Sequence, residues 1–263
     1  MKTIYRYILF GLLLSAFLSI NQIFAQDEQE QKEQQQKQRL FLIQTEKPFQ
    51  DKVSDYEITQ KKVNGFIKKY NFNLNWYAYS TDDNTYYYVS EINNLSDIDK
   101  MNEEFDNNST EESKKDFKVI NDIFNGIVDY YVSEVFSLST NSYYPKEPMT
   151  KPEDQKYYKQ SIYFIKPYSE AKLNNVLKEM KDFCEQNKIG LGYEIYSNVL
   201  GNNNEIVFME GAQSPDDYKQ FMEDFNNKYS DQFKPIWDKF MSLVKDTKSM
   251  DCWYRPELSM IKD

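Results

Sequence analysis

The sequence of 263 residues predicts an α+β protein built from two tandem βαββαβ modules whose antiparallel sheets pack face to face. The first observation is that the second half repeats the first in order. Tyr79-Ser80 returns as Tyr196-Ser197, and the acidic segment 103–107 returns as 223–227. The offset drifts between about 116 and about 120 residues, as expected when two copies accumulate small loop insertions and deletions. The other two observations are a shared order of elements and strands that are apolar on both sides.

The N-terminus has the features of a secretory signal peptide, residues 1–25. Lys2 and Arg6 supply positive charge, residues 7–20 are apolar, and Ala25 completes a cleavage site before Gln26. An uncleaved anchor is the alternative, but this run of 14 residues is shorter than the ~20 that span a bilayer. We therefore expect a periplasmic or secreted protein with no integral membrane segment after cleavage.

Charge and composition exclude several classes of function. Residues 1–25 carry two of the 32 basic side chains and no acidic one, so the mature chain has 30 basic and 42 acidic residues, a net charge of −12. A nucleic-acid partner is therefore not expected. The sequence has no His, which excludes His-based nucleophilic catalysis, His-ligated haem and His-containing zinc sites. We also find no Gly-rich phosphate loop and no metal-spaced cluster, and we expect no cofactor and no metal.

The first module is expected over residues 40–145, after a Gln/Glu/Lys-rich tether at 26–39 that cannot bury enough apolar surface to fold. Its first strand is apolar, and its first helix carries Tyr56, Val63 and Phe66 inward at helical spacing. The polar turn 82–84 joins the two central strands, and a break at 107–109 interrupts the second helix. We expect strands at 40–44, 73–80, 85–91 and 132–138, with helices at 53–70 and from Ser96 to about 130.

A Pro-punctuated polar stretch at 146–159 is expected to link the first module to a second one at 160–263. The turn 201–204 joins the central strands of this module. Ser214-Pro215 supplies an N-cap followed by Pro at the first helical position. We expect strands at 162–166, 190–197, 205–211 and 249–254, with helices at 169–187 and 214–245.

The strands are apolar on both faces, which indicates that both faces of each sheet are covered. Residues 40–43, 162–165 and 206–209 show this pattern, and Trp76 and Tyr77 place aromatic side chains on both faces of another strand. The simplest cover is the sister sheet, with four helices outside.

On these features the segment from 40 to 258 resembles the dimeric α/β-barrel superfamily in tandem form, as two ferredoxin-like modules forming a pseudo-dimeric α/β barrel. The resemblance implies that small molecules bind between sheet and helix or inside the barrel. Some members are monooxygenases, and others degrade haem with a His ligand, a residue that this chain lacks.

Aromatic residues on the sheet surfaces are the first candidate ligand site. Tyr and Trp combine a broad apolar face with a polar tip, which suits a small aromatic or apolar ligand held between the modules. The alternative is that these side chains form the core between the sheets. The six residues are Trp76, Tyr79, Tyr87, Tyr193, Tyr196 and Trp253, and we expect Trp76, Tyr193 and Trp253 to line one cavity.

Charged residues extend this candidate site. Glu91 and Glu210 occupy matching places at the ends of the third strands, where they could face one cavity as paired carboxylates, or lie in solvent. Arg255, in an aromatic segment, could grip a carboxylate or phosphate, or pair with a surface acid. No catalytic residue is assigned.

The two cysteines, Cys184 and Cys252, lie in a chain expected to enter an oxidising compartment, so a disulfide between them is expected, with two buried thiols as the alternative. Cys184 continues the helical stripe of Leu173, Leu177 and Met180 and is expected to face a core.

The sequence favours an exported, non-catalytic binding or interaction protein of the bacterial cell envelope. The alternatives are a cofactor-free enzyme of the dimeric α/β-barrel type that uses Tyr and Glu chemistry, and a structural envelope component. A deep pocket holding a buried Glu would favour the enzyme, and an open aromatic cleft without buried acids would favour the binding protein.

Overall fold

The computed structural model describes residues 39–200 and 204–261. The expected signal peptide, the tether up to residue 38 and part of the turn at 201–204 lie outside the described residues. No helix of the described part combines the length and apolar character needed to cross a membrane.

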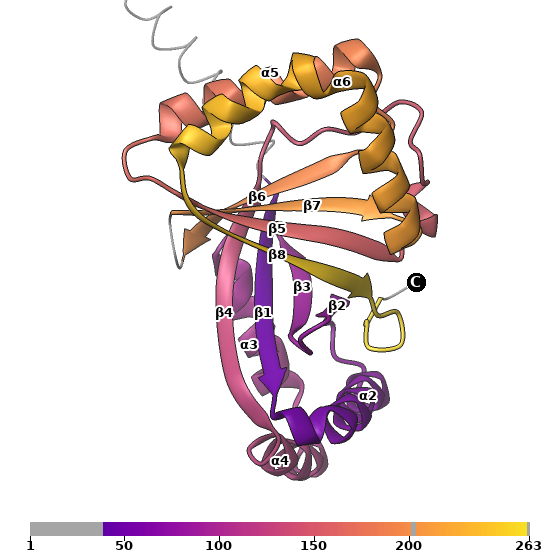
Figure 1. The fold of residues 1–263 in the computed structure, drawn as a ribbon. Helices are drawn as coiled ribbons and strands as arrows, with labels where there is room; N and C mark the ends of the chain where they lie inside the picture. Colours follow the sequence, from indigo (N-terminus) through magenta and orange to yellow (C-terminus); the bar gives the residue numbers. More distant parts are fainter. Residues whose placement is uncertain (1–38, 201–203, 262–263) are drawn as a thin grey trace, which may run out of the picture. The chain divides into compact units, whose positions relative to one another are not determined.

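The strands of the described residues form one closed antiparallel barrel, in the order β1-β3-β2-β8-β5-β7-β6-β4 (Figure 1). The first half contributes β1 (Leu40–Pro48), β2 (Tyr77–Thr81), β3 (Tyr86–Ile92) and β4 (Val128–Leu138). The second half contributes β5 (Tyr157–Ile165), β6 (Tyr193–Leu200), β7 (Glu205–Ala212) and β8 (Val244–Tyr254). Each half is a contiguous run of four strands.

The expectation of two separate sheets packed face to face is wrong. β2 pairs with β8 from Tyr79↔Tyr254 to Thr81↔Cys252, and β4 pairs with β6 from Val135↔Leu200 to Leu138↔Tyr196. Backbone hydrogen bonds thus join the two halves at both edges, so among the described strands no sheet edge is left unpaired. The strands are apolar on both faces because one face lines the barrel interior and the other lies under the helices.

The helices lie outside the barrel (Figure 1). Helices α5 and α6 cover the outer face of β5–β8, while α2, α3 and α4 lie around the first half. Their bounds are α2 (Val53–Lys69), α3 (Ser96–Asn108), α4 (Glu111–Phe124), α5 (Glu170–Asn187) and α6 (Pro215–Leu243), with 3₁₀ turns η1 (Gln50–Lys52) and η2 (Pro152–Asp154). Pro235 lies inside α6, and Figure 1 shows this helix curving around the sheet.

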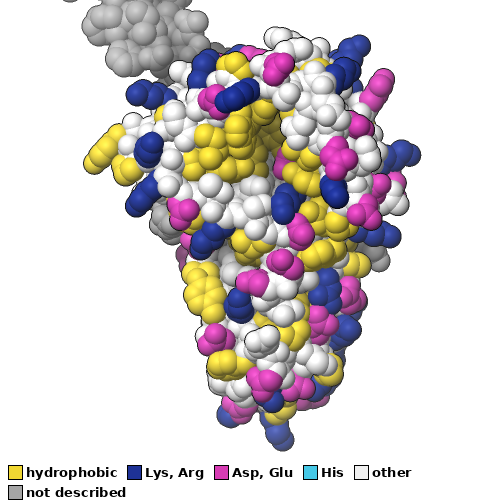
Figure 2. Space-filling view, viewed as in Figure 1, with side chains coloured by type: hydrophobic (Ala, Val, Ile, Leu, Met, Phe, Trp, Pro, Cys, Tyr) yellow, Lys and Arg dark blue, Asp and Glu magenta, His cyan; other side chains and the backbone are white. Residues whose placement is uncertain are grey.

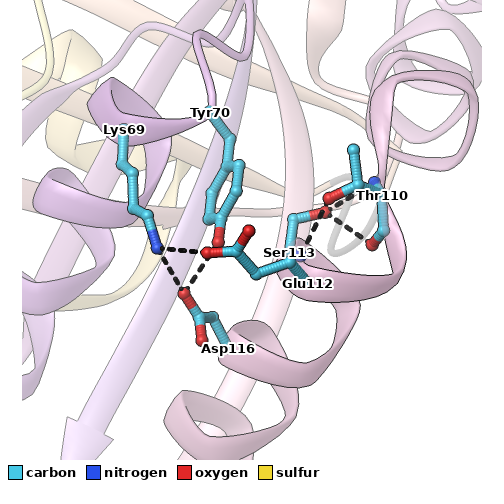
Figure 3. Close-up of polar contacts among 6 residues, drawn as sticks. All are labelled: Lys69, Tyr70, Thr110, Glu112, Ser113 and Asp116. Carbon is cyan, nitrogen blue, oxygen red and sulfur yellow. Dashed lines mark hydrogen bonds and ion pairs between the residues drawn. The ribbon is translucent and has the colours of Figure 1, made fainter.

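The expected break in the second helix of the first half is confirmed, because α3 ends at Asn108 and α4 begins at Glu111. Thr110 caps α4 (Figure 3). Its hydroxyl accepts a hydrogen bond from the Ser113 backbone N–H at 3.1 Å, and the Ser113 hydroxyl accepts one from the Thr110 backbone N–H at 2.8 Å. This reciprocal pair satisfies two backbone donors that a helix start leaves open.

Polar contacts tie α4 to the end of α2 (Figure 3). The Lys69 ammonium donates to Asp116 at 2.9 Å and to Glu112 at 3.1 Å, and the Tyr70 hydroxyl donates to Asp116 at 2.8 Å. The hydrogen bond from Lys69 is the main reason that the pKa of Asp116 is lowered. Helices α2 and α4 are therefore connected at their solvent side.

The largest buried cluster of the described residues lies between α5, α6 and the outer face of the second-half strands. Leu177 and Met180 of α5, Ile195 and Phe208 of the sheet, and Phe240 of α6 are all buried there. Smaller clusters lie under α2 and α4.

The expected disulfide is wrong, because both cysteines are free and buried. Cys184 faces the core between α5 and the sheet, as its helical spacing predicted. Cys252 lies on β8 and lines the barrel interior, so the barrel wall lies between the two thiols. Burial raises the pKa of each thiol to about 12.

Candidate functional site

A cavity of about 480 Å³ lies between α5, α6 and the outer face of β5–β7, and we refer to it as the helix–sheet cavity. Figure 2 shows hydrophobic side chains gathered around a hollow in the upper half of the molecule, over these elements. Its walls are mainly aromatic, with contributions from Tyr163, Phe208, Phe225, Phe233 and Trp237. A volume of this size and character suits a small, largely apolar molecule.

Glu210 is the acidic group at the sheet wall of this cavity. It lies directly opposite Tyr193 of β6 and Lys159 of β5, so the three side chains share the outer face of the sheet. The Tyr218 hydroxyl of α6 donates to the Glu210 Oε2 at 2.8 Å. Burial raises the pKa of Glu210, and the Tyr218 hydrogen bond and the Lys159 charge offset only part of this effect. The carboxyl group therefore keeps its proton at pH values where an ordinary Glu has lost it.

A second carboxyl group, Asp251 on β8, lies on the same outer face of the sheet two strands away from Glu210 and has the opposite character. Lys159 lies opposite Asp251 of β8 and donates to its Oδ1 at 2.9 Å, and the Tyr157 hydroxyl donates to the same atom at 2.7 Å. Burial alone would raise the pKa of Asp251, but the hydrogen bonds from Lys159 and Tyr157 lower it. Glu210 and Asp251 thus flank one lysine with their pKa values displaced in opposite directions, a pattern typical of paired acid and base roles.

A separate cavity of about 270 Å³ lies inside the barrel, and we refer to it as the lumen cavity. It adjoins a wider cavity of about 670 Å³ at one end of the barrel, and Tyr79, Tyr158, Glu194 and Tyr196 line both. The other polar lining residues of the lumen cavity include Thr45, Tyr87, Tyr130, Glu134, Gln160 and Glu205.

The six aromatic residues singled out in the sequence fall on two faces of the barrel. Tyr79, Tyr87 and Tyr196 line the lumen cavity. The other three do not share one cavity: Tyr193 lines the helix–sheet cavity, Trp76 donates to the Leu258 carbonyl at 3.0 Å, and Trp253 packs against Tyr157 with ring centroids 6.0 Å apart. Trp76 and Tyr79 differ by three positions, as do Tyr193 and Tyr196, and an odd spacing along a strand places side chains on opposite faces.

Glu91 and Glu210 line different cavities. Glu91 lies at the wider barrel-end cavity, where the Arg39 guanidinium donates to its two oxygens at 2.7 and 2.8 Å. This contact lowers the pKa of Glu91, in contrast to Glu210. From the sequence, Arg39 was expected to be the last residue of the tether. Its contact with Glu91 at the barrel-end cavity was therefore not predicted.

Arg255 has a structural position. Its guanidinium forms ion pairs with Glu57 of α2 and with Glu257, both at 2.7 Å, and donates to the Ser80 hydroxyl at 3.1 Å. It lines neither the helix–sheet cavity nor the lumen cavity. These contacts fix the segment after β8 against α2.

No protein-family model and no curated protein sequence matches this chain. Solved structures do match it. An anthrone oxidase-like protein is similar at a TM-score of 0.56 and 11% identity, covering 83% of this chain and 92% of that one. A proposed monooxygenase from Fusobacterium nucleatum subsp. nucleatum is similar at a TM-score of 0.50 and 15% identity, covering 82% and 92%. The fold is that of a dimeric α/β barrel.

A chlorite dismutase from Candidatus Nitrospira defluvii also matches this dimeric α/β barrel, at a TM-score of 0.49 and 11% identity, covering 83% and 92% of the two chains. The similarity to the anthrone oxidase-like protein and to the Fusobacterium protein confirms the expected fold-level resemblance. At these identities the likeness establishes the fold alone, and the chemistry has to come from the residues of this chain.

Proposed function

We propose that this dimeric α/β barrel is an enzyme that binds a small, mainly aromatic molecule in the helix–sheet cavity and exchanges a proton with it through Glu210. One observation carries the proposal: a carboxyl group with a raised pKa faces an aromatic cavity and accepts a hydrogen bond from Tyr218. A deep pocket with a buried Glu was the feature expected to favour an enzyme over a non-catalytic binding protein.

The residues around Glu210 suit proton transfer in both directions. A carboxyl group with a raised pKa holds its proton to a higher pH than an ordinary Glu and, once ionised, is a stronger base than an ordinary carboxylate. When Glu210 gives up its proton, the Tyr218 hydroxyl still donates to Oε2, and the Lys159 charge favours the carboxylate. The aromatic walls would hold a flat ring and keep water away from the reacting atoms.

The names of two similar structures support the same class of ligand. One is called anthrone oxidase-like and the other a proposed monooxygenase. We therefore propose a keto- or hydroxy-aromatic substrate with an acidic O–H group or CH2 group, such as the central-ring CH2 group of anthrone. Glu210 would take a proton from this group, and dioxygen would then oxidise the resulting anion.

The experiment uses anthrone as the probe. Trp237 lines the helix–sheet cavity, so bound anthrone should quench its fluorescence, and a Trp237→Phe variant should lose that part of the signal. In air, proton removal and oxidation would convert anthrone and dioxygen to anthraquinone and water, which absorbance can follow. We expect Glu210→Gln to lower the rate by about 100-fold while binding persists, because general acid–base catalysis typically contributes 10² or more.

Glu179→Gln is the matched control, since Glu179 is a surface residue of α5 that pairs with Lys239 at 2.7 Å. It should retain the wild-type rate. A Glu210→Gln variant as active as wild type would refute the proton-transfer role, and a wild-type protein that neither binds nor consumes anthrone would refute the substrate class.

A non-catalytic binding protein is the second candidate, and the lumen cavity between the two halves favours it. Under this alternative, a compound bound inside the barrel would be recovered chemically unchanged after incubation.

We also propose that the protein acts outside the cytoplasm, on the basis of the charged, apolar and small-residue regions of residues 1–25. When the full sequence is expressed in a bacterium with a periplasm, the N-terminal sequence of the exported protein should begin at Gln26. Recovery of the protein only from the cytoplasm, with Met1 or Lys2 at its start, would contradict export.

A further inference from the structure

The lumen cavity carries an excess of negative charge. Glu134, Glu194 and Glu205 line it, and no Lys or Arg is among the described residues that line it. Glu134 accepts a hydrogen bond from the Asn198 amide at 2.8 Å, and Glu194 accepts one from the Tyr144 hydroxyl at 3.0 Å. Within the described residues, neither Glu134 nor Glu194 forms an ion pair with a Lys or Arg.

At the barrel end, the positive charge of Arg39 interacts with the carboxylate of Glu194. This interaction contributes to the raised pKa of Arg39. Its guanidinium is already held at two points by Glu91. Glu134 and Glu194 therefore act on the lumen as negative charges without a Lys or Arg ion-pair partner among the described residues.

Tyrosine rings surround these carboxylates. Tyr79 and Tyr158 meet at nearly right angles with ring centroids 5.4 Å apart, and Tyr196 meets Phe41 in the same way at 5.4 Å. Tyr79, Tyr158 and Tyr196 each remain partly exposed. Aromatic faces carry negative partial charge and attract cations, most strongly where water is excluded.

Gln160 supplies an independent observation. It lines the lumen cavity from β5 and is only 7% exposed. Its side chain forms a hydrogen bond with Tyr87, but its carbonyl Oε1 has no hydrogen-bond partner within the described residues. Buried polar side-chain atoms are nearly always hydrogen-bonded, so an unpaired acceptor at a cavity wall indicates a missing donor. A ligand with an N–H group would provide that donor.

We propose that the lumen cavity binds a small organic cation, a protonated amine with an aromatic or apolar body. The carboxylates would balance its charge, the tyrosine rings would pack against its body, and Gln160 would accept from its N–H group. No group of three or more His, Cys, Asp or Glu within the described residues could hold a metal ion, which favours an organic cation. The site lies on the opposite face of the sheet from Glu210 and goes beyond the function proposed for the helix–sheet cavity.

The test compares three probes with one skeleton: 2-phenylethylammonium, neutral 2-phenylethanol and anionic 3-phenylpropanoate. Their affinities for the full mature chain are measured by titration calorimetry at neutral pH and low salt. We expect the cation to bind about tenfold tighter than the alcohol, with the anion weakest, because cation–π contacts and a carboxylate partner add to the shared apolar contacts. Equal affinity for cation and alcohol, or no measurable cation binding, would overturn the proposal.

Substitutions of the lumen carboxylates test whether the cation binds in the lumen cavity. Glu194→Gln should weaken cation binding about tenfold and leave alcohol binding unchanged, because it removes the charge and retains the size of the side chain. Glu179→Gln, which removes one surface charge from α5, controls for net charge. If Glu194→Gln does not fold, Glu134→Gln serves as the second variant. Cation binding that is insensitive to the lumen variants but lost in Glu210→Gln would place the ligand in the helix–sheet cavity and refute the proposal.

Discussion

Replacing Phe240 with Ala should lower the free energy of unfolding by about 3–5 kcal/mol. Phe240 lies near the end of α6 and is fully buried. Its ring centroid lies 4.9 Å from that of Tyr163, 5.3 Å from that of Trp237 and 5.8 Å from that of Phe208. Removing the ring loses apolar burial and leaves a cavity among aromatic side chains that can relax only in part. The variant should also loosen the wall that the helix–sheet cavity shares with α6.

Urea unfolding of the wild type and of Phe240→Ala measures this effect. Ile58→Ala is the comparison, because Ile58 is a large apolar side chain on α2 that is 51% exposed, and its loss should change the free energy by about 0.5 kcal/mol or less. A cost below about 1 kcal/mol for Phe240→Ala would mean that the end of α6 is not packed against the sheet as the structure shows.

The element order of this fold can be predicted from the sequence because helix and strand periodicities are local. Inward residues at helical spacing predicted α2, where Tyr56 and Phe66 are buried. The break at 107–109 could be predicted because a polar Asn/Ser/Thr stretch offers the cap that Thr110 provides. The start of β5 was not predicted. Tyr157 was assigned to the linker, although every second residue from 158 to 162 points into the lumen, as expected for a strand.

The pattern of apolar residues on both faces of the strands cannot predict that the sheet closes into a barrel. A strand that faces a sister sheet and a strand that faces a barrel interior are apolar on the same two sides. Only the pairing of β2 with β8 and of β4 with β6 distinguishes the two arrangements, and these contacts join residues far apart in sequence.

The candidate site was predicted less well because its geometry depends on strand parity. A shift of one residue moves a side chain to the other face of a sheet. Matching Glu91 to Glu210 contains such a shift. In β3, Glu91 lies on the same face as Tyr87 and Val89, which line the lumen. In β7, Val207 and Met209 line the lumen, so Glu210 lies on the opposite face, toward the helices. The sequence therefore selected the acidic residue of the helix–sheet cavity, but with the wrong partner.

Replacing Tyr56 with Ala should cost about 3–5 kcal/mol, an effect similar to that of Phe240→Ala but in the first half. Tyr56 of α2 is fully buried, and its ring contacts Tyr86 and Phe124 with centroids 4.6 and 5.9 Å apart. Its hydroxyl donates to Glu46 of β1 and shares a hydrogen bond of 2.9 Å with Tyr88. The substitution thus removes both a packed ring and the hydroxyl group that donates a hydrogen bond to the Glu46 carboxyl group.

Tyr56→Phe isolates the hydroxyl and should cost about 1–3 kcal/mol, since Glu46 loses a buried hydrogen-bond donor. The cost should depend on pH. Burial raises the pKa of Glu46 above its ordinary value of 4.5, and the hydrogen bonds from Tyr56 and Gln60 offset part of that rise. Below pH 4.5 both the folded and the unfolded state hold the proton, and stability falls as pH rises through the higher folded-state pKa.

Without the Tyr56 hydroxyl, the folded-state pKa of Glu46 rises further, so the loss of stability extends to higher pH and the cost of Tyr56→Phe grows from acidic toward alkaline conditions. Urea unfolding at pH values from about 4 to about 8 would measure this slope. In a Glu46→Gln background the group no longer titrates, so the same substitution should have a cost that is independent of pH across this range. A pH-dependent cost that persists in that background, or one that decreases as pH rises, would show that Glu46 is not the group linked to Tyr56.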